Sequence, residues 1–377
     1  MNYTTLAVSL AGLSFMLTVI WGGPLLRVLR HFKIGKQIRV EEPGKHMVKM
    51  GTPTMGGVMI ILPVMMLTIL LNAAALIGFK MSGKSIFVPL ITLLAFGILG
   101  ALDDWEGIHG KRKGDGMRTR TKFILQWLIA GSLAWALKYV LGAPNLYIPG
   151  VQVQIDLGWW YVPIAAFVIV AESNAINFTD GLDGLAGLIS VTIFAAYGAI
   201  ALIQGQNFLA QFSFTMVGAL FGFLWFNVHP AQLFMGDTGS LFLGFIISII
   251  AIKFNESSVG ISGAYAVQAA PAVSVGFLMV PIFDTLRVFV TRMVKNKPPF
   301  SPDKTHIHHY LLILGFSHGK ATLILTLVGF FFIGISILLK NLTVFWLIFI
   351  LAGIASLLSF ITIFLANRKK QQLVQPD

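Results

Sequence analysis

Long apolar stretches follow one another along the whole chain, separated by short polar segments. About eleven of them approach the roughly 20 residues that an α-helix needs to cross a bilayer. They fall at 5–26, 56–79, 86–102, 123–142, 159–176, 185–203, 210–227, 239–254, 265–290, 322–339 and 343–366. Apolar runs of this length are typical of membrane-spanning helices. The pattern predicts an all-α integral membrane protein, a polytopic bundle of about 10–11 transmembrane helices.

The segment at 265–290 is longer than the others and contains Pro271, Gly276 and Pro281. Proline removes a main-chain hydrogen bond inside a helix and commonly bends or breaks it. We therefore expect this segment to be kinked or tilted. No polar block or linker divides the chain, so we expect a single membrane domain over residues 1–377, ending in a short cytoplasmic tail at 367–377.

Composition supports the same class of protein. Apolar residues make up 56% of the chain and charged residues 11%, against about 45–50% and 25% in soluble domains. The absence of cysteine excludes disulfides and thiolate chemistry. A net charge of +12 would suggest a nucleic-acid partner in a soluble protein. In a membrane protein it favours topology signals, anionic membrane lipids and phosphorylated substrates, and we expect no nucleic acid.

Lysine and arginine concentrate in alternate loops, at 27–50, 103–122 and 287–320, and in the C-terminal tail. The intervening loops carry only Lys80, Lys84, Lys253 and Lys340, with Lys138 near a helix end. Under the positive-inside rule the basic loops are cytoplasmic, so the N-terminus lies outside and the C-terminus inside. We expect a multi-pass protein of the bacterial inner membrane.

The chemistry-bearing side chains fall on the same side as the basic loops. All histidines, and all carboxylates except Asp156 and Glu256, lie in predicted cytoplasmic loops or at cytoplasmic helix ends. A transporter or flippase, the alternative class, would place charges near the bilayer midplane or repeat one half in the other. Asp284 is the nearest candidate for such a charge, and we assign it to a local ion pair with Arg287. The distribution favours an enzyme with a cytoplasmic-face active site.

Aspartates at two helix ends are candidate metal ligands or catalysts. Asp103 and Asp104 close the third apolar segment, where adjacent carboxylates repel each other unless a cation or proton intervenes. The alternative is a solvated helix end with nearby basic residues as counter-ions. Asp237 opens the eighth segment, where it either caps the helix or joins a phosphate site at the helix N-terminus.

Asn174, Asn177, Asp180 and Asp183 recur every third residue at the junction of two apolar segments. On a helix or a 3₁₀ turn this spacing lines them along one side. Their oxygens are hard ligands that suit Mg²⁺ holding a diphosphate. The competing interpretation is a polar turn in which an aspartate caps the next helix, and it explains fewer of these side chains.

His306, His308 and His309 follow a proline-rich stretch. Imidazoles beside Lys304 and Lys320 could contact phosphate or sugar oxygens, or act as general acid and base. A zinc site and a merely exposed histidine cluster are the alternatives. Adjacent histidines lack the i, i+4 spacing of zinc ligands on a helix.

With these residues in view, the chain from about residue 27 to 315 resembles the polyprenyl-phosphate N-acetylhexosamine-1-phosphate transferases. The resemblance rests on Lys49 to Gly57, Leu102-Asp103-Asp104, Val153 to Ala186 and Phe234 to Ser240, in that order. It implies a Mg²⁺-dependent enzyme that transfers a sugar 1-phosphate from a cytoplasmic UDP-sugar to undecaprenyl phosphate and releases UMP. The family also suggests a homodimer.

The resemblance also implies roles for individual residues. Asp237 matches the family's Mg²⁺ ligand, with Asp103 and Asp180 as candidate further ligands. Asp103 and Asp104 match the pair assigned to metal or to activation of the lipid phosphate. We predict as catalytic residues Asp103, Asp104, Asp180, His308 and His309. We predict as substrate-binding residues Lys49, Thr54, Asn174, Asn177, Asp183, Asn227, His306 and Phe234, the last by stacking on uracil.

Two branches of the family compete for this chain. The motifs from Thr52 to Gly57 and from Asp156 to Ala186 are typical of the muramoyl branch, which uses UDP-MurNAc-pentapeptide and makes lipid I. The sequence from His306 to Tyr310 and the eleventh segment resemble the branch that uses UDP-GlcNAc for teichoic acids and other surface glycans. We give the longer motifs more weight and predict the muramoyl-pentapeptide donor, used in the first membrane step of peptidoglycan synthesis.

Overall fold

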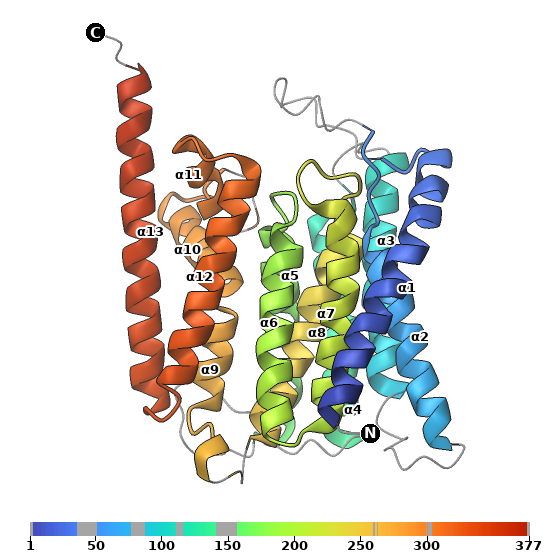
Figure 1. Ribbon diagram of the computed structural model, residues 1–377. Helices are drawn as coiled ribbons and strands as arrows, with labels where there is room; N and C mark the ends of the chain where they lie inside the picture. Colours follow the sequence, from blue (N-terminus) through green and yellow to red (C-terminus); the bar gives the residue numbers. More distant parts are fainter. Residues whose placement is uncertain are drawn as a thin grey trace.

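The computed structural model is a bundle of long α-helices (Figure 1). It describes residues 3–35, 51–76, 87–110, 116–140, 157–258, 261, 263–298, 300 and 304–374. In these ranges the regular structure is helical, apart from one isolated bridge between Gly35 and Pro53. The prediction of an all-α membrane protein is confirmed.

Seven helices in the described part of the chain are long and apolar enough to cross a bilayer. They are α1 (Tyr3–His31), α5 (Tyr161–Thr179), α6 (Leu185–Ile203), α7 (Asn207–Asn227), α8 (Gly236–Ser257), α12 (His318–Leu338) and α13 (Val344–Val374). Beside them in the bundle lie α2 (Gly57–Leu76), α3 (Phe87–His109) and α4 (Thr119–Tyr139). Each predicted apolar segment thus corresponds to a helix or, in one case, to a bent pair.

The long segment at 265–290 is broken, as its prolines predicted. The short helix η3 (Gly263–Tyr265) comes first and is followed by α9 (Ala270–Phe277) and α10 (Met279–Val294). The axes of α9 and α10 differ by 77°. Pro271 and Pro281 lie in the first turns of α9 and α10, where a proline removes no helical hydrogen bond. The short helices α11 (Ile307–Ile313) and η2 (Gly158–Trp160) complete the described elements.

The central helix of the bundle is α8. It packs mainly against α3 and α5, and nearly all of its residues from Thr238 to Phe254 are buried. Glycines allow the helices to approach this closely, because a Cβ at Gly57 of α2 would overlap the backbone of α8 at Gly239. Backbone contacts of this kind fix the ends of α2, α3 and α8 relative to one another.

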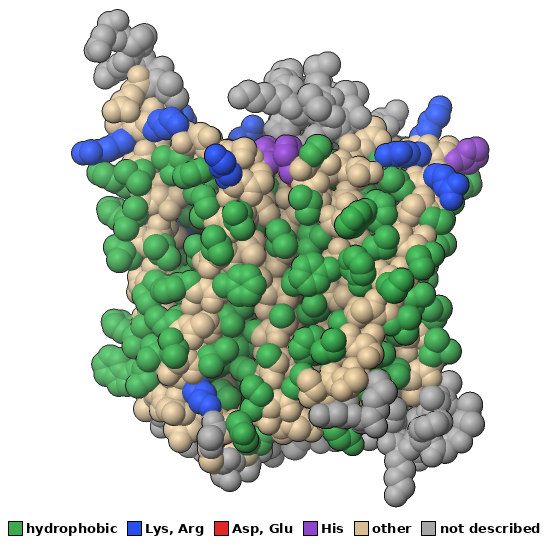
Figure 2. Space-filling view, viewed as in Figure 1, with side chains coloured by type: hydrophobic (Ala, Val, Ile, Leu, Met, Phe, Trp, Pro, Cys, Tyr) green, Lys and Arg blue, Asp and Glu red, His purple; other side chains and the backbone are tan. Residues whose placement is uncertain are grey.

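Lysine, arginine and histidine side chains gather along one end of the molecule, above a broad apolar band (Figure 2). We call this the basic end. α1 begins at the opposite end and α13 finishes at the basic end (Figure 1), as an odd number of crossings requires.

One carboxylate departs from the predicted distribution. Glu172 is buried within α5, well before the end of that helix at Thr179, rather than at a helix end. A Cβ at Gly244 of α8 would overlap the main chain at Glu172. The glycine therefore lets α8 close over this part of α5, which covers the carboxylate.

Candidate active site

Three aspartates meet where α3 ends and α8 begins, and we call Asp103, Asp104 and Asp237 the carboxylate cluster. The Lys122 ammonium, from the first turn of α4, contacts the Asp237 carboxylate and lies 3.5 Å from Asp103 Oδ2. Asn177 of α5 donates from Nδ2 to Asp237 Oδ1, over 2.9 Å. Four helices thus supply the side chains of one polar site, and those from α3, α5 and α8 are among the predicted site residues.

Asp104 caps the N-terminus of α8. Its carboxylate accepts hydrogen bonds from the main-chain amides of Asp237 (3.1 Å) and Thr238 (3.0 Å) and from the Thr238 hydroxyl (2.6 Å). The Thr54 hydroxyl also donates to it, over 3.5 Å. A carboxylate at this position satisfies amides that the helix leaves unpaired and interacts favourably with the helix dipole. These two amides of α8 are therefore not free for a phosphate, and Asp237 is not the cap.

Asp103 has fewer partners than Asp104. It is buried and accepts from the Met117 amide (3.1 Å), while its second oxygen faces Lys122. Three carboxylates beside one ammonium carry a net negative charge, which favours the binding of a further cation. The hard oxygens of Asp103 and Asp237 are ligands that Mg²⁺ prefers. The donor set therefore fits the Mg²⁺ that the sequence predicted.

Lys122 is a site residue that the sequence analysis missed. The sequence analysis counted it only among the basic residues of the loop at 103–122, which were used to assign the cytoplasmic side of the membrane. Its position at the start of α4, on the side facing α3 and α8, is a tertiary feature. One signal was available in the sequence, because Lys122 stands just before the apolar segment that follows the Asp103-Asp104 pair.

The predicted line of polar residues from Asn174 to Asp183 is only partly realised. Asn174 Nδ2 donates to Gln126 Oε1 of α4 (2.8 Å), and Asn177 faces the carboxylate cluster. α5 ends at Thr179, with Asp180 as the residue after its last turn. Asp183 therefore lies beyond the helix, and its Oδ2 is 2.8 Å from His229 Nδ1.

The three histidines of the C-terminal motif lie together at the start of α11. The His308 ring centroid is 4.3 Å from that of His309 and 5.6 Å from that of His306. His308 packs on the turn after α5, where a Cβ at Gly181 would overlap its ring. Burial, reinforced by the neighbouring His309, lowers the pKa of His308 to about 3. His308 is therefore neutral near pH 7 and can exchange hydrogen bonds without carrying a charge.

Asp284 of α10 holds this histidine group in place. Its carboxylate accepts from His306 Nδ1 (2.9 Å), the Arg287 guanidinium (2.6 Å) and the Ile307 amide (3.2 Å). The predicted local pair with Arg287 is confirmed. The carboxylate also fixes the first residues of α11, so the motif does not form an isolated surface loop.

The remaining predicted substrate residues surround the segment before α8. Phe234 is half-buried, and its amide donates to the Pro53 carbonyl over 2.8 Å. The buried Asn227 side chain accepts from the Gly184 amide (3.0 Å) and donates to the Leu233 carbonyl (2.8 Å). Thr54 therefore lies close to Phe234 through the Pro53 contact. Lys49 lies outside the described residues.

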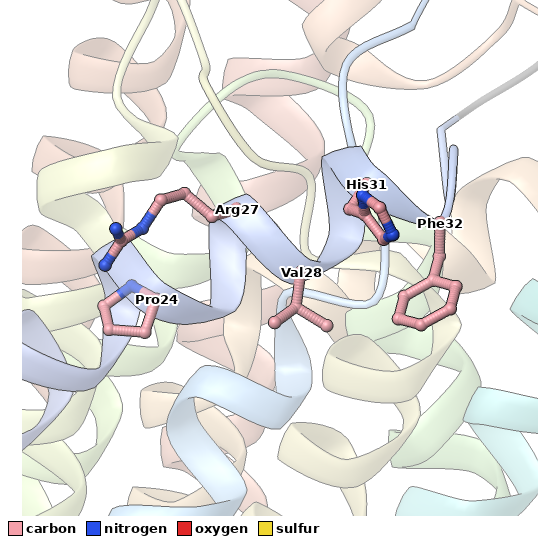
Figure 3. Close-up of a pocket in the computed structure, with 5 residues that line it drawn as sticks. All are labelled: Pro24, Arg27, Val28, His31 and Phe32. Atoms are coloured by element: carbon pink, nitrogen blue, oxygen red, sulfur yellow. The ribbon is translucent and has the colours of Figure 1, made fainter.

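A shallow depression occurs elsewhere, on the last turns of α1 (Figure 3). Its lining residues are Pro24, Arg27, Val28, His31 and Phe32. They come from one helix and the residue that follows it, and no predicted site residue is among them. The chemistry predicted from the motifs therefore does not belong to this depression.

Comparisons with known proteins identify the family of the chain. Residues 86–255, which carry the carboxylate cluster, match the model of glycosyl transferase family 4. The phospho-N-acetylmuramoyl-pentapeptide-transferase of Chloroflexus aurantiacus (strain J-10-fl) is 37% identical over 336 residues, 86% of each chain. The enzymes of the same name from Geobacillus sp. (strain WCH70) and Bacillus subtilis (strain 168) are each 37% identical. Their matches span 85% and 82% of this chain, and 93% and 90% of the relatives.

Proposed function

The chain belongs to the phospho-N-acetylmuramoyl-pentapeptide-transferase family, and we propose that it transfers phospho-MurNAc-pentapeptide from UDP-MurNAc-pentapeptide to undecaprenyl phosphate. The products would be lipid I and UMP. The observation that carries the proposal is the carboxylate cluster with Lys122 at the basic end of an apolar bundle. Two polyanionic substrates need such a site, with a cation bound by carboxylates and a basic surface around it.

The proposed reaction is a phosphoryl transfer. An oxygen of the lipid phosphate attacks the phosphorus that carries the sugar, and the bond from that phosphorus to the UMP oxygen breaks. We propose Asp237 as the residue that holds Mg²⁺, with Asp103 and Asp180 as candidate further ligands. A Mg²⁺ ion bound there would supply charge neutralisation for the diphosphate and the leaving UMP. The Lys122 ammonium lies between Asp103 and Asp237 and would pair with oxygens of the same diphosphate.

The two adjacent aspartates take different roles in this proposal. Asp103 directs its Oδ2 atom towards Lys122. We propose that this carboxylate accepts the remaining proton of the lipid phosphate. Asp104 accepts four hydrogen bonds at the start of α8 and positions Asp237. His308, which packs on the α5–α6 turn at Gly181, would contact the substrate as a neutral hydrogen-bonding group, with His309 beside it.

We propose the nucleotide pocket beside the segment that precedes α8. Phe234 is half-buried there and would stack on uracil. Lys49, Thr54, Asn174, Asn177, Asp183 and His306 stay in the proposed set of donor-binding residues. Asn227 joins the α5–α6 turn to Leu233, so it would act by shaping the pocket that Phe234 enters.

The acceptor would stay in the bilayer throughout the reaction. α10 turns by 77° from α9 and exposes Leu286, Val290 and Met293. These apolar side chains and the neighbouring Arg287 would present a lipid-facing surface next to the histidine group. We further propose that the basic end is cytoplasmic, that the protein resides in the inner membrane, and that it forms a homodimer.

A donor assay tests the proposal. The purified full-length protein receives undecaprenyl phosphate, Mg²⁺ and either UDP-MurNAc-pentapeptide or UDP-GlcNAc, and the lipid product and UMP are measured together. We expect equal amounts of lipid I and UMP from the muramoyl donor, none in a metal chelator, and a loss of about 10³-fold in Asp237→Asn. Lipid-linked GlcNAc instead would assign the chain to the other branch, and activity in a chelator would overturn the metal mechanism.

A further inference from the structure

The last helix of the bundle is longer than a membrane crossing needs. A crossing takes about 20 residues, whereas α13 has 31, from Val344 to Val374. Residues 367–374 of the expected tail continue this helix. α13 therefore runs on at the basic end, where it packs against the short helix α11 (Figure 1).

One face of α13 stays covered along this length. The buried residues recur at helical spacing, and they are Val344, Leu347, Leu351, Ala355 and Ala366. Lys369 lies one turn beyond the last of them and is half-buried, whereas its neighbours Arg368 and Lys370 are exposed. The covered face of the helix therefore ends at Lys369.

The Lys369 ammonium contacts the end of α11. Its Nζ atom donates to the main-chain carbonyl of Leu314, the residue after the last turn of that helix, over 2.8 Å. A Cβ at the next residue, Gly315, would lie 2.8 Å from the same Nζ atom. The glycine therefore leaves room for the ammonium. The last carbonyls of a helix have no partner inside it, and a positive charge there interacts favourably with the helix dipole.

α11 is thus held at both of its ends by side chains of other helices. The Asp284 carboxylate of α10 accepts from the Ile307 amide at the start, over 3.2 Å, and Lys369 of α13 donates at the finish. A negative group at the start and a positive group at the finish both match the helix dipole. A helix of seven residues is too short to be stable by itself, so these outside contacts set its position.

The position of α11 determines where the histidine motif lies. His308 and His309 belong to the first turn of α11. The His308 ring packs so closely on the α5–α6 turn that a Cβ at Gly181 would overlap it. A displacement of α11 would therefore change how this ring meets the turn next to Asp180. Support at the far end of α11 reaches the active site through a helix of only two turns.

A lysine near a cytoplasmic helix end can also be no more than a topology signal. That interpretation treats the three adjacent basic residues of α13 alike. In the structure they differ, because the Arg368 guanidinium lies 4.7 Å from the centre of the Phe364 ring and Lys370 is exposed. Lys369 instead points to α11. The difference between neighbours is the observation that a topology signal leaves unexplained.

We propose that Lys369 is a positioning residue, which holds the C-terminal end of α11 and so fixes His308 and His309 at the active site. The inference rests on the role in substrate contact proposed above for these histidines. Lys369 acts through α11 and touches no substrate.

Chemical modification tests the contact without any substrate. Diethyl pyrocarbonate acylates accessible neutral imidazoles, and mass spectrometry of peptides from the full-length protein gives the rate at His308. Lys369→Met keeps the length of the side chain and removes the donor. We expect it to raise the rate at His308 about 5-fold, because α11 opens more often when it loses a hydrogen bond. Lys370→Met is the matched control, and acylation of the exposed His31 of α1 should be unchanged in both variants.

Steady-state kinetics test the consequence for the reaction. Lys369→Met should lower kcat by about 10-fold or more, because a small displacement of positioned groups slows the chemical step, while its Tm stays nearly unchanged. Lys370→Met should keep the kcat of the unaltered protein. Lys369→Arg, whose guanidinium can also donate to Leu314, should restore most of kcat and the slow acylation of His308.

The proposal is overturned if His308 reacts at the same rate in Lys369→Met and Lys370→Met, or if Lys369→Met keeps full kcat. It is also overturned if Lys369→Arg behaves like the methionine variant. The acylation rates can be read whichever donor the enzyme uses, so failure of this inference is distinguishable from failure of the proposed transferase reaction.

Discussion

Asp103 and Asp104 are neighbours in the sequence but have different partners. The Asp104 carboxylate receives the first amides of α8, whereas Asp103 faces the Lys122 ammonium. One side chain therefore holds the site together, and the other remains available to a substrate or a metal ion. This difference explains why a pair of identical residues need not share one function.

Asparagine at each position should separate these roles. Asp104→Asn replaces one acceptor oxygen by an NH₂ group that faces donors, so we expect a loss of about 1–3 kcal/mol of stability. Asp103→Asn should unfold at nearly the same temperature but lower kcat by about 100-fold or more. Thermal unfolding and steady-state kinetics on both variants measure the two effects. A larger stability loss in Asp103→Asn would reverse the assignment.

His308 should make stability depend on pH. Its pKa is about 6.5 in an unfolded chain and about 3 in the folded protein, so between these values only the unfolded chain binds the proton. Stability from this group therefore falls as pH drops below about 6.5, and near pH 5 the loss is about 2 kcal/mol. His308→Gln should lose less stability than the unaltered protein between about pH 7.5 and pH 5. Equal losses in both proteins would mean that His308 is protonated in the folded state.

At the scale of helices, glycine contacts set how α3 meets α8. A Cβ at Gly100 would overlap the α8 backbone at Asp237 and Thr238, one helical turn before Asp104. At Gly97, on the same helix, a Cβ would meet only the flexible Ile61 side chain, at 3.0 Å. The absence of a side chain at Gly100 therefore allows Asp104 to reach the start of α8.

These two glycines provide a matched pair of variants. Replacing glycine by alanine favours the helix by about 1 kcal/mol at both positions. The difference in stability between the two variants therefore reports the contact of residue 100 with α8. Gly100→Ala should separate α3 from α8, reduce stability by about 1–3 kcal/mol relative to Gly97→Ala, and depress activity. Gly97→Ala should retain activity. Similar behaviour of the two variants in unfolding and turnover would contradict the contact.

At the scale of the whole molecule, the basic end and the opposite end define an orientation. The α6–α7 connection at Gly205 is exposed and lies at the end away from the basic side chains, while α13 finishes at the basic end (Figure 1). Positive charges are retained on the cytoplasmic side of the membrane. The arrangement therefore favours a cytoplasmic carboxylate cluster.

Topology reporters check this orientation. A reporter fused after Asp377 should be active on the cytoplasmic side, and one inserted at Gly205 should be active outside, because five predicted crossings, an odd number, lie between the two positions. Both fusions must retain membrane insertion for the comparison to hold. Two reporters on the same side would show that the predicted number of crossings is wrong.

The sequence by itself determined the helices and most of the chemical groups. Continuous apolar length is a local property, so the spans could be placed before any contact was known, and the prolines at 271 and 281 marked the break between α9 and α10. The short helix α11 was not predicted, because seven residues with two histidines carry no spanning signal. Polar clusters that interrupt apolar runs marked Asp237 and the Asp103-Asp104 pair as candidates, and the family resemblance supplied their expected roles.

Only the tertiary structure decided which partner each group takes. Asp104 accepts from a helix-start amide 133 residues later in the chain, Lys122 joins the carboxylate cluster, and Asp183 pairs with His229. Such contacts depend on how glycine-lined helices pack and where each helix ends, which no local pattern specifies. The physical reason is that the length of an apolar segment depends only on consecutive residues. The hydrogen-bond or ion-pair partner of a side chain depends instead on how helices that are distant in sequence pack together.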